Sequence, residues 1–395
     1  MNQQNLMLRG LLAAVRLSGE GWNAGDFSEF LPNWPFEIVD VTDATPFATL
    51  ERTDHGFVFS SDFGDGPAPH ASLVNTVCDL IAHAARQRTR ERPDNLCLHA
   101  SAVQVGEGLV VMPATRRAGK SVMTAVLGAR GHGVFSDDVL PISALSGAPI
   151  VGRATGASIR LRLPLPEQLP PAVRDHIEAH AGSQNRQYLY VPSPVIADQD
   201  ASAPLCAFVS IDYASDAETE FVEVSRGKML KSLLKQNFSR DADGDQILAA
   251  LFHMVEHLPC YLLRYSDVVA AAQALETAFA NGDAPSLMMP VLPPVEDVEL
   301  GWGDSEPDQP LVRRAQATVV DLEGEAFGVS ADQRNIVHLD TGALRVLGLF
   351  DVPTREREVV DILSAAFPTV DAAQIENDVS GAVRRFRRAG LLVAT

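Results

Sequence analysis

Up to about residue 280, apolar residues alternate between the spacing typical of strands and that typical of helices. Near the N-terminus, FEIVDV and GFVFSS have strand character, and SLVNTVCDLIAHAARQRTRE carries apolar residues at helical spacing. Farther along, LCLHASAVQV and GLVVMPA predict strands, and a helix is expected from about Lys120 to Arg130. Because strands, glycine-bearing turns and helices follow one another here, we expect an α/β core.

The end of the chain has a different pattern. The run QATVVDLEGEAFGVSADQRNIVHLD predicts three short strands, separated by turns at Glu323-Gly324 and Asp332-Gln333. Three helices are expected to follow, and we expect Thr354 to cap the second. The third helix places five apolar residues on one face, namely Ile375, Val379, Ala382, Val383 and Phe386. This order predicts a compact α+β module of winged-helix type.

A change in composition separates these two parts. Between Asn281 and Pro310 the chain contains six prolines among acidic and small residues, which is typical of a linker. We therefore divide the chain into an N-terminal α+β segment (1–92), an α/β domain (93–280), a linker (281–312) and a C-terminal domain (313–395).

The overall composition is that of a globular protein with a strongly acidic balance. The formal net charge of −19 argues against nucleic-acid binding, which needs clustered Lys and Arg. The four cysteines form no CxxC pair, so they indicate neither a disulfide framework nor a zinc ribbon. No stretch approaches the roughly 20 apolar residues of a membrane span. We expect a cytoplasmic protein that binds neither nucleic acid nor membrane. The sequence leaves open whether it forms a homo-oligomer.

A candidate phosphate site lies between the strand at Val110 and the helix at Lys120. The segment VVMPATRRAGKS places Gly-Lys-Ser at the start of a helix, as a P-loop requires. In such a loop the backbone N–H groups hold the phosphates, the lysine reaches the β- and γ-phosphates, and the serine binds magnesium. The predicted contacts are Ala114, Thr115, Arg116, Arg117, Ala118, Gly119, Lys120 and Ser121.

Two carboxylates follow shortly after this segment. Asp137 and Asp138 end the predicted strand GVFSDDVLPI. Next to a phosphate loop, one acid can hold magnesium and the other can accept a hydroxyl proton during phosphoryl transfer. Their position therefore strengthens the interpretation of Gly-Lys-Ser as a phosphate site.

The central region resembles the catalytic domain of HPr kinase/phosphorylase and of HPr-kinase-related proteins. The resemblance runs through Leu98-His99-Ala100-Ser101, Gly119-Lys120-Ser121, Arg130-Gly131-His132 and Asp137-Asp138. It implies an ATP- and Mg²⁺-dependent kinase of α/β P-loop fold. In that case His99 is the catalytic histidine, Asp138 the proton acceptor, Lys120 the phosphate lysine and Ser121 a magnesium ligand, and Asp137 lies beside the metal.

The chain departs from this family within the loop. The family has glycine at the positions of Ala114 and Arg117 and usually serine at Arg116. Side chains at these positions would either obstruct the nucleotide or add positive charge against its phosphates. The sequence leaves both alternatives open.

The C-terminal pattern resembles PqqD-like domains. It combines three strands, Leu339-Asp340-Thr341-Gly342, a helix starting near Thr354 and a last helix ending in RRAGLL. In that family the module binds the leader of a ribosomally made precursor peptide as an added strand. The resemblance places peptide contacts at Asn335, Val337, Leu339, Arg384, Arg385 and Arg388.

Together these observations predict a kinase-like enzyme that phosphorylates a hydroxyl, with serine favoured, on a precursor peptide captured by the C-terminal domain. Other peptide-maturation enzymes are candidate partners. The alternative is a non-catalytic adaptor whose altered loop no longer turns over ATP and whose C-terminal domain delivers peptide to a partner enzyme. Arg116 and Arg117 are the residues that favour the alternative.

Overall fold

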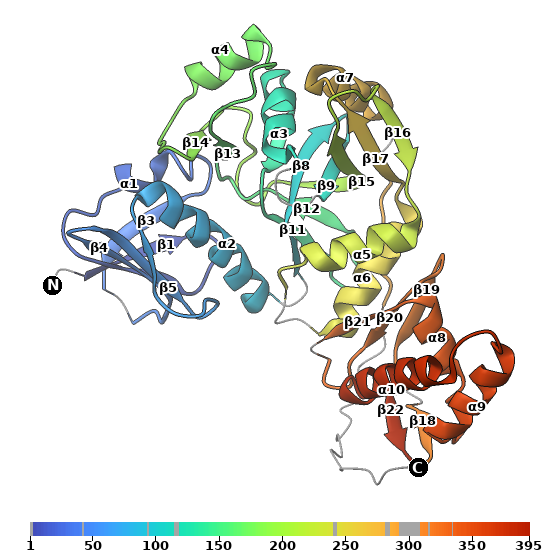
Figure 1. The fold of residues 1–395 in the computed structure, drawn as a ribbon. Helices are drawn as coiled ribbons and strands as arrows, with labels where there is room; N and C mark the ends of the chain where they lie inside the picture. The colour runs from blue at the N-terminus through green and yellow to red at the C-terminus, as the bar shows by residue number, and fades with distance from the viewer. Residues whose placement is uncertain are drawn as a thin grey trace. The chain divides into compact units, whose positions relative to one another are not determined.

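A computed structural model describes residues 3–41, 43–92, 95–113, 118–239, 243–280, 285–291, 309–314, 317–333 and 335–395 (Figure 1). The chain forms two compact units. The first comprises Met1–Val224, Lys235–Asp241 and His253–Val291. The second comprises Ser225–Leu234, Ala242–Phe252 and Leu292–Thr395. Most of the predicted linker lies outside the described residues.

The first unit begins with a six-stranded sheet in the order β3-β1-β2-β4-β5-β6, in which only β2 and β4 pair in parallel. Its strands are β1 (Gln3–Leu8), β2 (Ala14–Ser18), β3 (Phe36–Asp40), β4 (Pro46–Thr53), β5 (Gly56–Ser61) and β6 (Ala68–His70). A short α1 (Gly25–Ser28) and a long α2 (Leu73–Glu91) accompany the sheet. The strands predicted at FEIVDV and GFVFSS and the following helix are therefore confirmed. A core of aromatic and aliphatic side chains, including Phe27, Phe30 and Leu50, holds this layer together.

The same unit continues into a nine-stranded mixed sheet, whose main path is β10-β8-β9-β15-β12-β11-β7, with β17 beside β15 and β16 beside β17. The strands are β7 (Asn95–Leu98), β8 (Ala100–Val105), β9 (Gly108–Pro113), β10 (Gly133–Ser136), β11 (Leu140–Ser143), β12 (Val151–Arg153), β15 (Ser202–Tyr213), β16 (Glu220–Glu223) and β17 (Cys260–Tyr265). Strand β15 runs parallel to both β9 and β17. The predicted mixed α/β core is confirmed.

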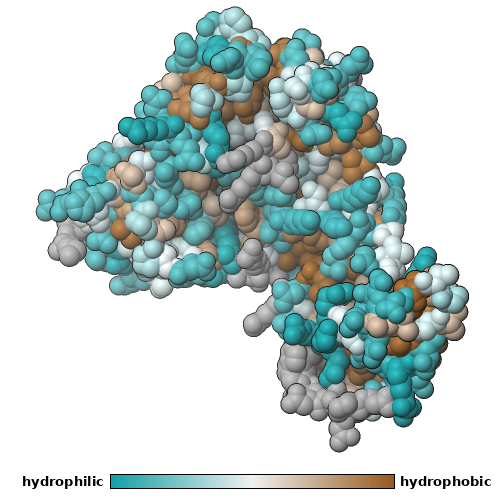
Figure 2. All heavy atoms as spheres, viewed as in Figure 1, coloured by the Kyte–Doolittle hydropathy of each residue, from teal (hydrophilic) through white to brown (hydrophobic). Residues whose placement is uncertain are grey.

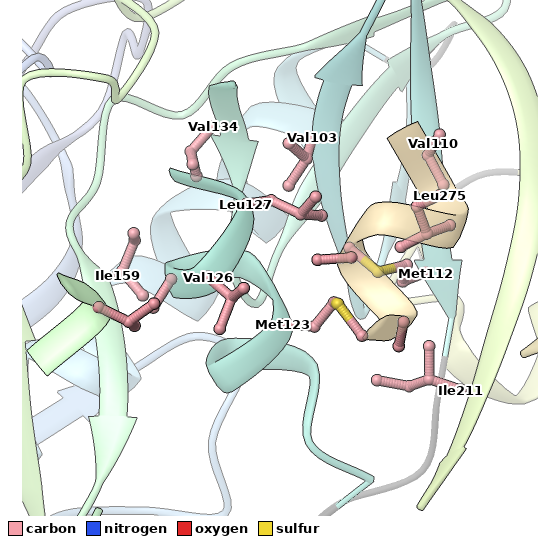
Figure 3. Packing of buried hydrophobic residues seen from close by; sticks show 14 of the residues in the cluster. Val103, Val110, Met112, Met123, Val126, Leu127, Val134, Ile159, Ile211 and Leu275 are labelled. Atoms are coloured by element: carbon pink, nitrogen blue, oxygen red, sulfur yellow. The ribbon is translucent and has the colours of Figure 1, made fainter. Parts of the chain in front are cut away.

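Helices cover this sheet, and a two-stranded ribbon lies beside it (Figure 1). These elements are α3 (Lys120–Ala129), α4 (Pro171–Ala179), α7 (Val268–Phe279), β13 (Ile159–Arg162) and β14 (Tyr188–Val191). Met123, Val126 and Leu127 of α3 pack into a core shared with the strands and α7 (Figure 3). All three are fully buried, because the face of α3 that they share is apolar. This packing fixes the start of α3 relative to β9.

The second unit contains the C-terminal strands and helices. The sheet β19-β20-β21 joins Val319–Leu322, Glu325–Val329 and Ile336–Leu339, and helices α8 (Thr341–Gly348), α9 (Glu356–Ala366) and α10 (Ala372–Arg388) follow. The predicted three strands, three helices and buried face of α10 are confirmed. A final strand β22 (Leu392–Ala394), which the pattern did not predict, pairs with β18 (Leu311–Arg313).

The predicted start of α9 is one residue off. Arg355 is the N-cap, and its backbone N–H donates to Glu358 Oε2 at 2.7 Å. Thr354 instead uses its hydroxyl to donate to the carbonyls of Leu349 and Val352. A threonine next to a helix start can use its hydroxyl either to cap the helix or to bond nearby backbone carbonyls. The sequence alone does not distinguish these two arrangements.

Two helices from the middle of the chain also belong in part to the second unit. These are the first turns of α5 (Arg226–Gln236) and of α6 (Gly244–His257). The backbone N–H of Arg226 donates to Glu323 Oε2 at 2.7 Å, and that of Gly244 donates to the carbonyl of Gln333 at 2.7 Å. Both helices therefore pack against the β19-β20-β21 sheet. In the ranges that the structure describes, no helix is long and apolar enough to cross a membrane.

Candidate functional site

Helix α3 begins at a glycine that the local geometry requires. Gly119 has a φ of +92°, and a Cβ atom added there would lie 2.8 Å from the Tyr265 hydroxyl. This left-handed conformation strains other residues. The first N–H groups of α3 have no partner within the helix, which makes its start suited to an anion. The predicted contacts at Ala114, Thr115, Arg116 and Arg117 lie outside the described residues, whereas Ala118 packs against the core.

Three predicted side chains meet beside the start of α3. Lys120 Nζ lies 3.1 Å from His99 Nε2, and His99 Nε2 in turn lies 2.9 Å from Asp138 Oδ1. Burial lowers the pKa of the Lys120 ammonium, while Asp138 and Asp137 oppose that shift. One ring nitrogen cannot accept a proton from the lysine and donate one to the carboxylate at the same time. Lys120 and Asp138 therefore compete for His99 Nε2.

Asp137 has the most unusual environment of the predicted residues. Its side chain is 7 % exposed, and Oδ2 accepts a hydrogen bond of 2.9 Å from the Arg160 backbone N–H. Burial and the nearby Asp138 raise the pKa of Asp137 to about 7, although the Ser121 hydroxyl also bonds to it. The other carboxylate oxygen, Oδ1, is buried and has no hydrogen-bond partner among the described residues. A buried, unpaired oxygen of this kind is expected to have a ligand or water partner.

Arg160 on β13 joins the two carboxylates, and no motif in the sequence marked it. Its Nη2 lies 3.0 Å from Asp138 Oδ2, in addition to its backbone contact with Asp137. The guanidinium also contacts Cys78 Sγ of α2 and lies 5.1 Å from the ring centre of Tyr188. In the sequence, arginines alternate with apolar residues along IRLR, which shows that they share one face of a strand. That signal did not reveal their partner.

The last residue of α5 and the segment that follows it orient the histidine, and the sequence did not indicate this. The backbone N–H of His99 donates to the Gln236 carbonyl at 2.7 Å, and that of Phe238 donates to the Cys97 carbonyl at 2.7 Å. The Phe238 ring stacks on the His99 ring with centres 5.7 Å apart. These contacts join residues far apart in the chain, so local spacing carries no trace of them. They hold the imidazole toward Lys120 and Asp138.

A small pocket opens beside the acid pair. Its volume is about 20 Å³, enough for an ordered water molecule. The lining comprises Cys78, Ile81, Asp137, Asp138, Val139, Thr155, Ala157, Ser158, Arg160 and Tyr190. Cys78 and Ile81 belong to α2, so the N-terminal layer, for which the sequence indicated no chemistry, forms one wall of the site.

The donors around Asp137 suit a magnesium ion. Magnesium prefers hard oxygen ligands and keeps several waters or phosphate oxygens. Asp137 Oδ1 is unpaired and buried, and the Ser121 hydroxyl lies next to the same carboxylate. Within the described parts of the chain, no three or more His, Cys, Asp and Glu side chains are arranged so that they alone could hold a metal ion. The protein residues therefore fit a site completed by phosphate and water rather than a closed protein cage.

The predicted peptide edge is the outermost strand of the C-terminal sheet. Strand β21 pairs with β20 on one side, and no other described strand pairs with it. Val337 packs against the domain core and Leu339 is only 2 % exposed, whereas Asn335 is exposed. Strand edges of this kind are templates for an added strand.

The hydrogen-bond register shows which residues face the open edge. Ser330 N–H donates to the Asn335 carbonyl at 2.7 Å, which marks these two as a hydrogen-bonded pair. Since such pairs alternate along an antiparallel ladder, Val337 and Leu339 also direct their backbone groups to β20. The outward N–H and C=O groups therefore belong to Ile336 and His338. The predicted contacts Asn335, Val337 and Leu339 alternate with these two residues, and the sequence alone does not show this register.

The predicted arginines lie on the exposed face of α10. Arg384, Arg385 and Arg388, together with Arg387, are exposed, while Val383 and Phe386 are buried. No described acidic residue forms an ion pair with these four arginines. On the face of the molecule seen in Figure 2, hydrophilic residues cover most of the surface of this part and apolar ones show between them. The arginine cluster is therefore available to a partner.

Comparison with known proteins identifies the C-terminal part. Residues 319–392 match the family model described as Coenzyme PQQ synthesis protein D (PqqD). This segment is a PqqD domain, as its sequence resemblance predicted. No curated protein matches the chain.

Two solved structures show limited similarity to the chain. TbiB1 in complex with the TbiA(beta) leader peptide is 21 % identical, with a TM-score of 0.19, covering 20 % of this chain and 93 % of that one. The Hpr(Ser) kinase/phosphatase from Coxiella burnetii is 12 % identical, with a TM-score of 0.25, covering 46 % of this chain and 91 % of that one.

Proposed function

We propose that the chain is an ATP-dependent phosphotransferase that phosphorylates a hydroxyl, with serine favoured, on a ribosomally made precursor peptide held by its PqqD domain. The observation that carries this proposal is the meeting of Lys120, His99 and Asp138 at the glycine-initiated start of α3. The catalytic part is residues 93–280, and the segment from β9 to α3 is its phosphate loop. The PqqD domain, of winged-helix type, captures the substrate.

The nucleotide site uses the start of α3. The first N–H groups of the helix and the Lys120 ammonium bind the β- and γ-phosphates. Ser121 and Asp137 would hold Mg²⁺, which neutralises phosphate charge when bound. Asp137 suits this role because its Oδ1 could bind the metal ion without breaking an existing hydrogen bond.

Asp138 accepts the proton of the acceptor hydroxyl. Arg160 and His99 each bond one of its two oxygens, so the carboxylate is held in one orientation. When a phosphate attracts the Lys120 ammonium, His99 Nε2 is released from the lysine and is left to bond Asp138 alone. His99 thereby positions the proton acceptor, and Phe238 positions His99.

Peptide capture uses main-chain groups at the open edge of β21 and charges on α10. An extended peptide can add there as a further strand, since the outward groups of Ile336 and His338 lack partners in the sheet. The exposed arginines of α10 favour a peptide with acidic residues.

Calorimetry with ATP and Mg²⁺ tests the nucleotide site. Wild type should bind ATP, and Lys120→Ala should bind it at least tenfold more weakly. The matched control is Lys228→Ala, which removes a lysine far along the chain and should bind ATP as wild type does. If wild type and Lys120→Ala are equally unable to bind, the nucleotide site is wrong.

A transfer assay tests the reaction itself. Labelled ATP, Mg²⁺ and a library of serine-containing peptides are incubated with the full chain, and the peptides are analysed by mass spectrometry. A phosphoryl group on serine is the expected product. ATP binding without any transfer would favour the adaptor alternative.

A further inference from the structure

Helix α5 is strongly basic in a chain that is strongly acidic. Its eleven residues, RGKMLKSLLKQ, contain one arginine, three lysines and no acidic residue, although the whole chain carries a formal charge of −19. Lys228 and Lys231 lie three positions apart and so share one face of the helix. Lys228 is exposed and Lys231 is partly buried, within the part of α5 that belongs to the second unit. The helix therefore presents positive charge within the PqqD-containing unit.

Contacts place this face of α5 next to the open strand. Lys231 Nζ lies 3.1 Å from Glu325 Oε2, and the same carboxylate bonds the His338 ring. His338 is one of the two residues whose backbone groups face outward from β21. A single carboxylate thus links the lysine face of α5 to the edge where a strand would be added.

The two faces of the C-terminal sheet are therefore both covered by basic helices. Val337 and Leu339 point into the core that contains Phe386 of α10. Ile336 and His338 alternate with them, so their side chains point to the other face, where Glu325 and α5 lie. Successive side chains of a strand added at β21 would point alternately toward the α10 side and the α5 side.

We infer that α5 forms a second basic wall of the peptide site, and that the site takes an extended peptide with acidic side chains on both faces. Charge complementarity is the argument for this occupant. Lys228 shares a helix face with Lys231, which bonds Glu325 beside His338, and the exposed α10 arginines belong to the helix whose buried face shares the core with Val337. The inference rests on the peptide capture proposed above and extends it, since α5 lies outside the segment that matches the PqqD model. Selectivity for the peptide would thus depend partly on the central region of the chain.

Fluorescence anisotropy with the full chain tests this surface without ATP. The probe is a short labelled peptide of repeated Glu-Glu-Thr-Val, in which adjacent glutamates point to opposite faces of a strand, and the reference is the same peptide with Gln for Glu. The Glu peptide should bind about tenfold more tightly at low salt, and the difference should shrink at high salt.

Single charge reversals separate the two walls. Lys228→Glu should weaken binding of the Glu peptide about three- to tenfold and leave the Gln peptide within about twofold, and Arg384→Glu should do the same from the other side. Lys228→Gln should give an intermediate loss. Arg357→Glu reverses an exposed charge on α9 and is the matched control, which should leave both peptides unaffected. Hydrogen exchange should show new protection at the amides of Ile336 and His338.

Each outcome decides the matter. If Lys228→Glu binds like Arg357→Glu while Arg384→Glu is weakened, α5 is not a wall of the site. If the Glu peptide binds no better than the Gln peptide, or neither binds, the acidic occupant is wrong. Because the assay contains no nucleotide, a failure of phosphoryl transfer would refute the proposed reaction and leave this inference standing.

Discussion

The two proposed sites differ in what they would use: the acid pair offers side chains that are buried or held by neighbours, whereas the edge of β21 offers exposed main chain. Asp137 is 7 % exposed, and Asp138 is held by both His99 and Arg160. At β21, by contrast, the outward backbone groups of Ile336 and His338 face an unpaired edge, and the neighbouring α10 arginines have no described ion-pair partner. A side chain held by specific partners cannot be replaced without loss, while an open strand edge tolerates many peptide sequences. Single substitutions should therefore greatly reduce phosphoryl transfer at the acid pair, whereas at the edge of β21 they should weaken peptide binding by smaller amounts.

The largest effect is expected for Asp138→Asn. This change removes the proposed proton acceptor and leaves the start of α3 intact, so phosphoryl transfer should fall about 10²–10⁴-fold, equivalent to about 3–5 kcal/mol, with ATP binding largely retained. Single-turnover kinetics at saturating ATP and Mg²⁺ measure this. Asp137→Asn is the matched comparison and should raise the Mg²⁺ requirement instead. A wild-type rate in Asp138→Asn would remove that residue from the mechanism.

The next effect concerns stability and pH. The pKa of Asp137 is raised to about 7 by burial and by Asp138, whereas an aspartate in the unfolded chain titrates near about 4. Between these values the folded protein retains a proton that the unfolded chain has lost. The free energy of unfolding should therefore decrease as pH rises from about 4 to about 7, by at most about 4 kcal/mol from this group.

Asp137→Asn tests this linkage, because asparagine does not titrate and the other groups are shared with wild type. Urea denaturation without Mg²⁺ should show that the variant gains stability relative to wild type between pH 5 and pH 8, on the order of a few kcal/mol. The same pH dependence in both proteins would contradict the raised pKa.

At the open edge, two adjacent prolines should behave differently. Ile336→Pro removes an outward N–H, which an edge strand tolerates, so the fold should persist while binding of the Glu peptide falls by about 1–2 kcal/mol. Val337→Pro removes an N–H that faces Gly328 within the ladder, and it should destabilise the domain by about 3 kcal/mol. Anisotropy and urea denaturation separate the two. If Ile336→Pro binds as wild type does, the peptide is not added at β21.

At both regions, the sequence predicted features that depend on local spacing and missed those that depend on long-range pairing. Gly119, Lys120, Ser121 and the acid pair could be proposed from the sequence, because local spacing places a helix start and a strand end at one edge of a sheet. His99 came from family resemblance. Arg160 and Phe238 were missed, because β13 and the segment after α5 reach the site only through long-range pairing.

In the C-terminal part, the order of elements and the buried stripe of α10 were predicted from periodicity. The outward-facing residues of β21 were not, because they depend on the register with β20. Nor did the sequence predict that residues 225–234 and 242–252 would join this unit. A proline-rich linker indicates that the C-terminal domain is separate from the rest of the chain, but it does not show which distant helices pack against the β19-β20-β21 sheet.

An effect on binding no larger than that of Ile336→Pro is expected for the α10 charges. Arg384→Glu with Arg388→Glu should weaken binding of the Glu peptide by about 1–2 kcal/mol at low salt, because these side chains are exposed and solvent screens them. The loss should come mainly from slower association, and the salt dependence of wild-type binding should diminish. Stopped-flow anisotropy at several salt concentrations measures both. The neutral Gln peptide is the internal control, since it should bind the variant and wild type alike through main-chain bonds. An equal loss for both peptides would mean that the two arginines support the shape of the edge rather than its charge.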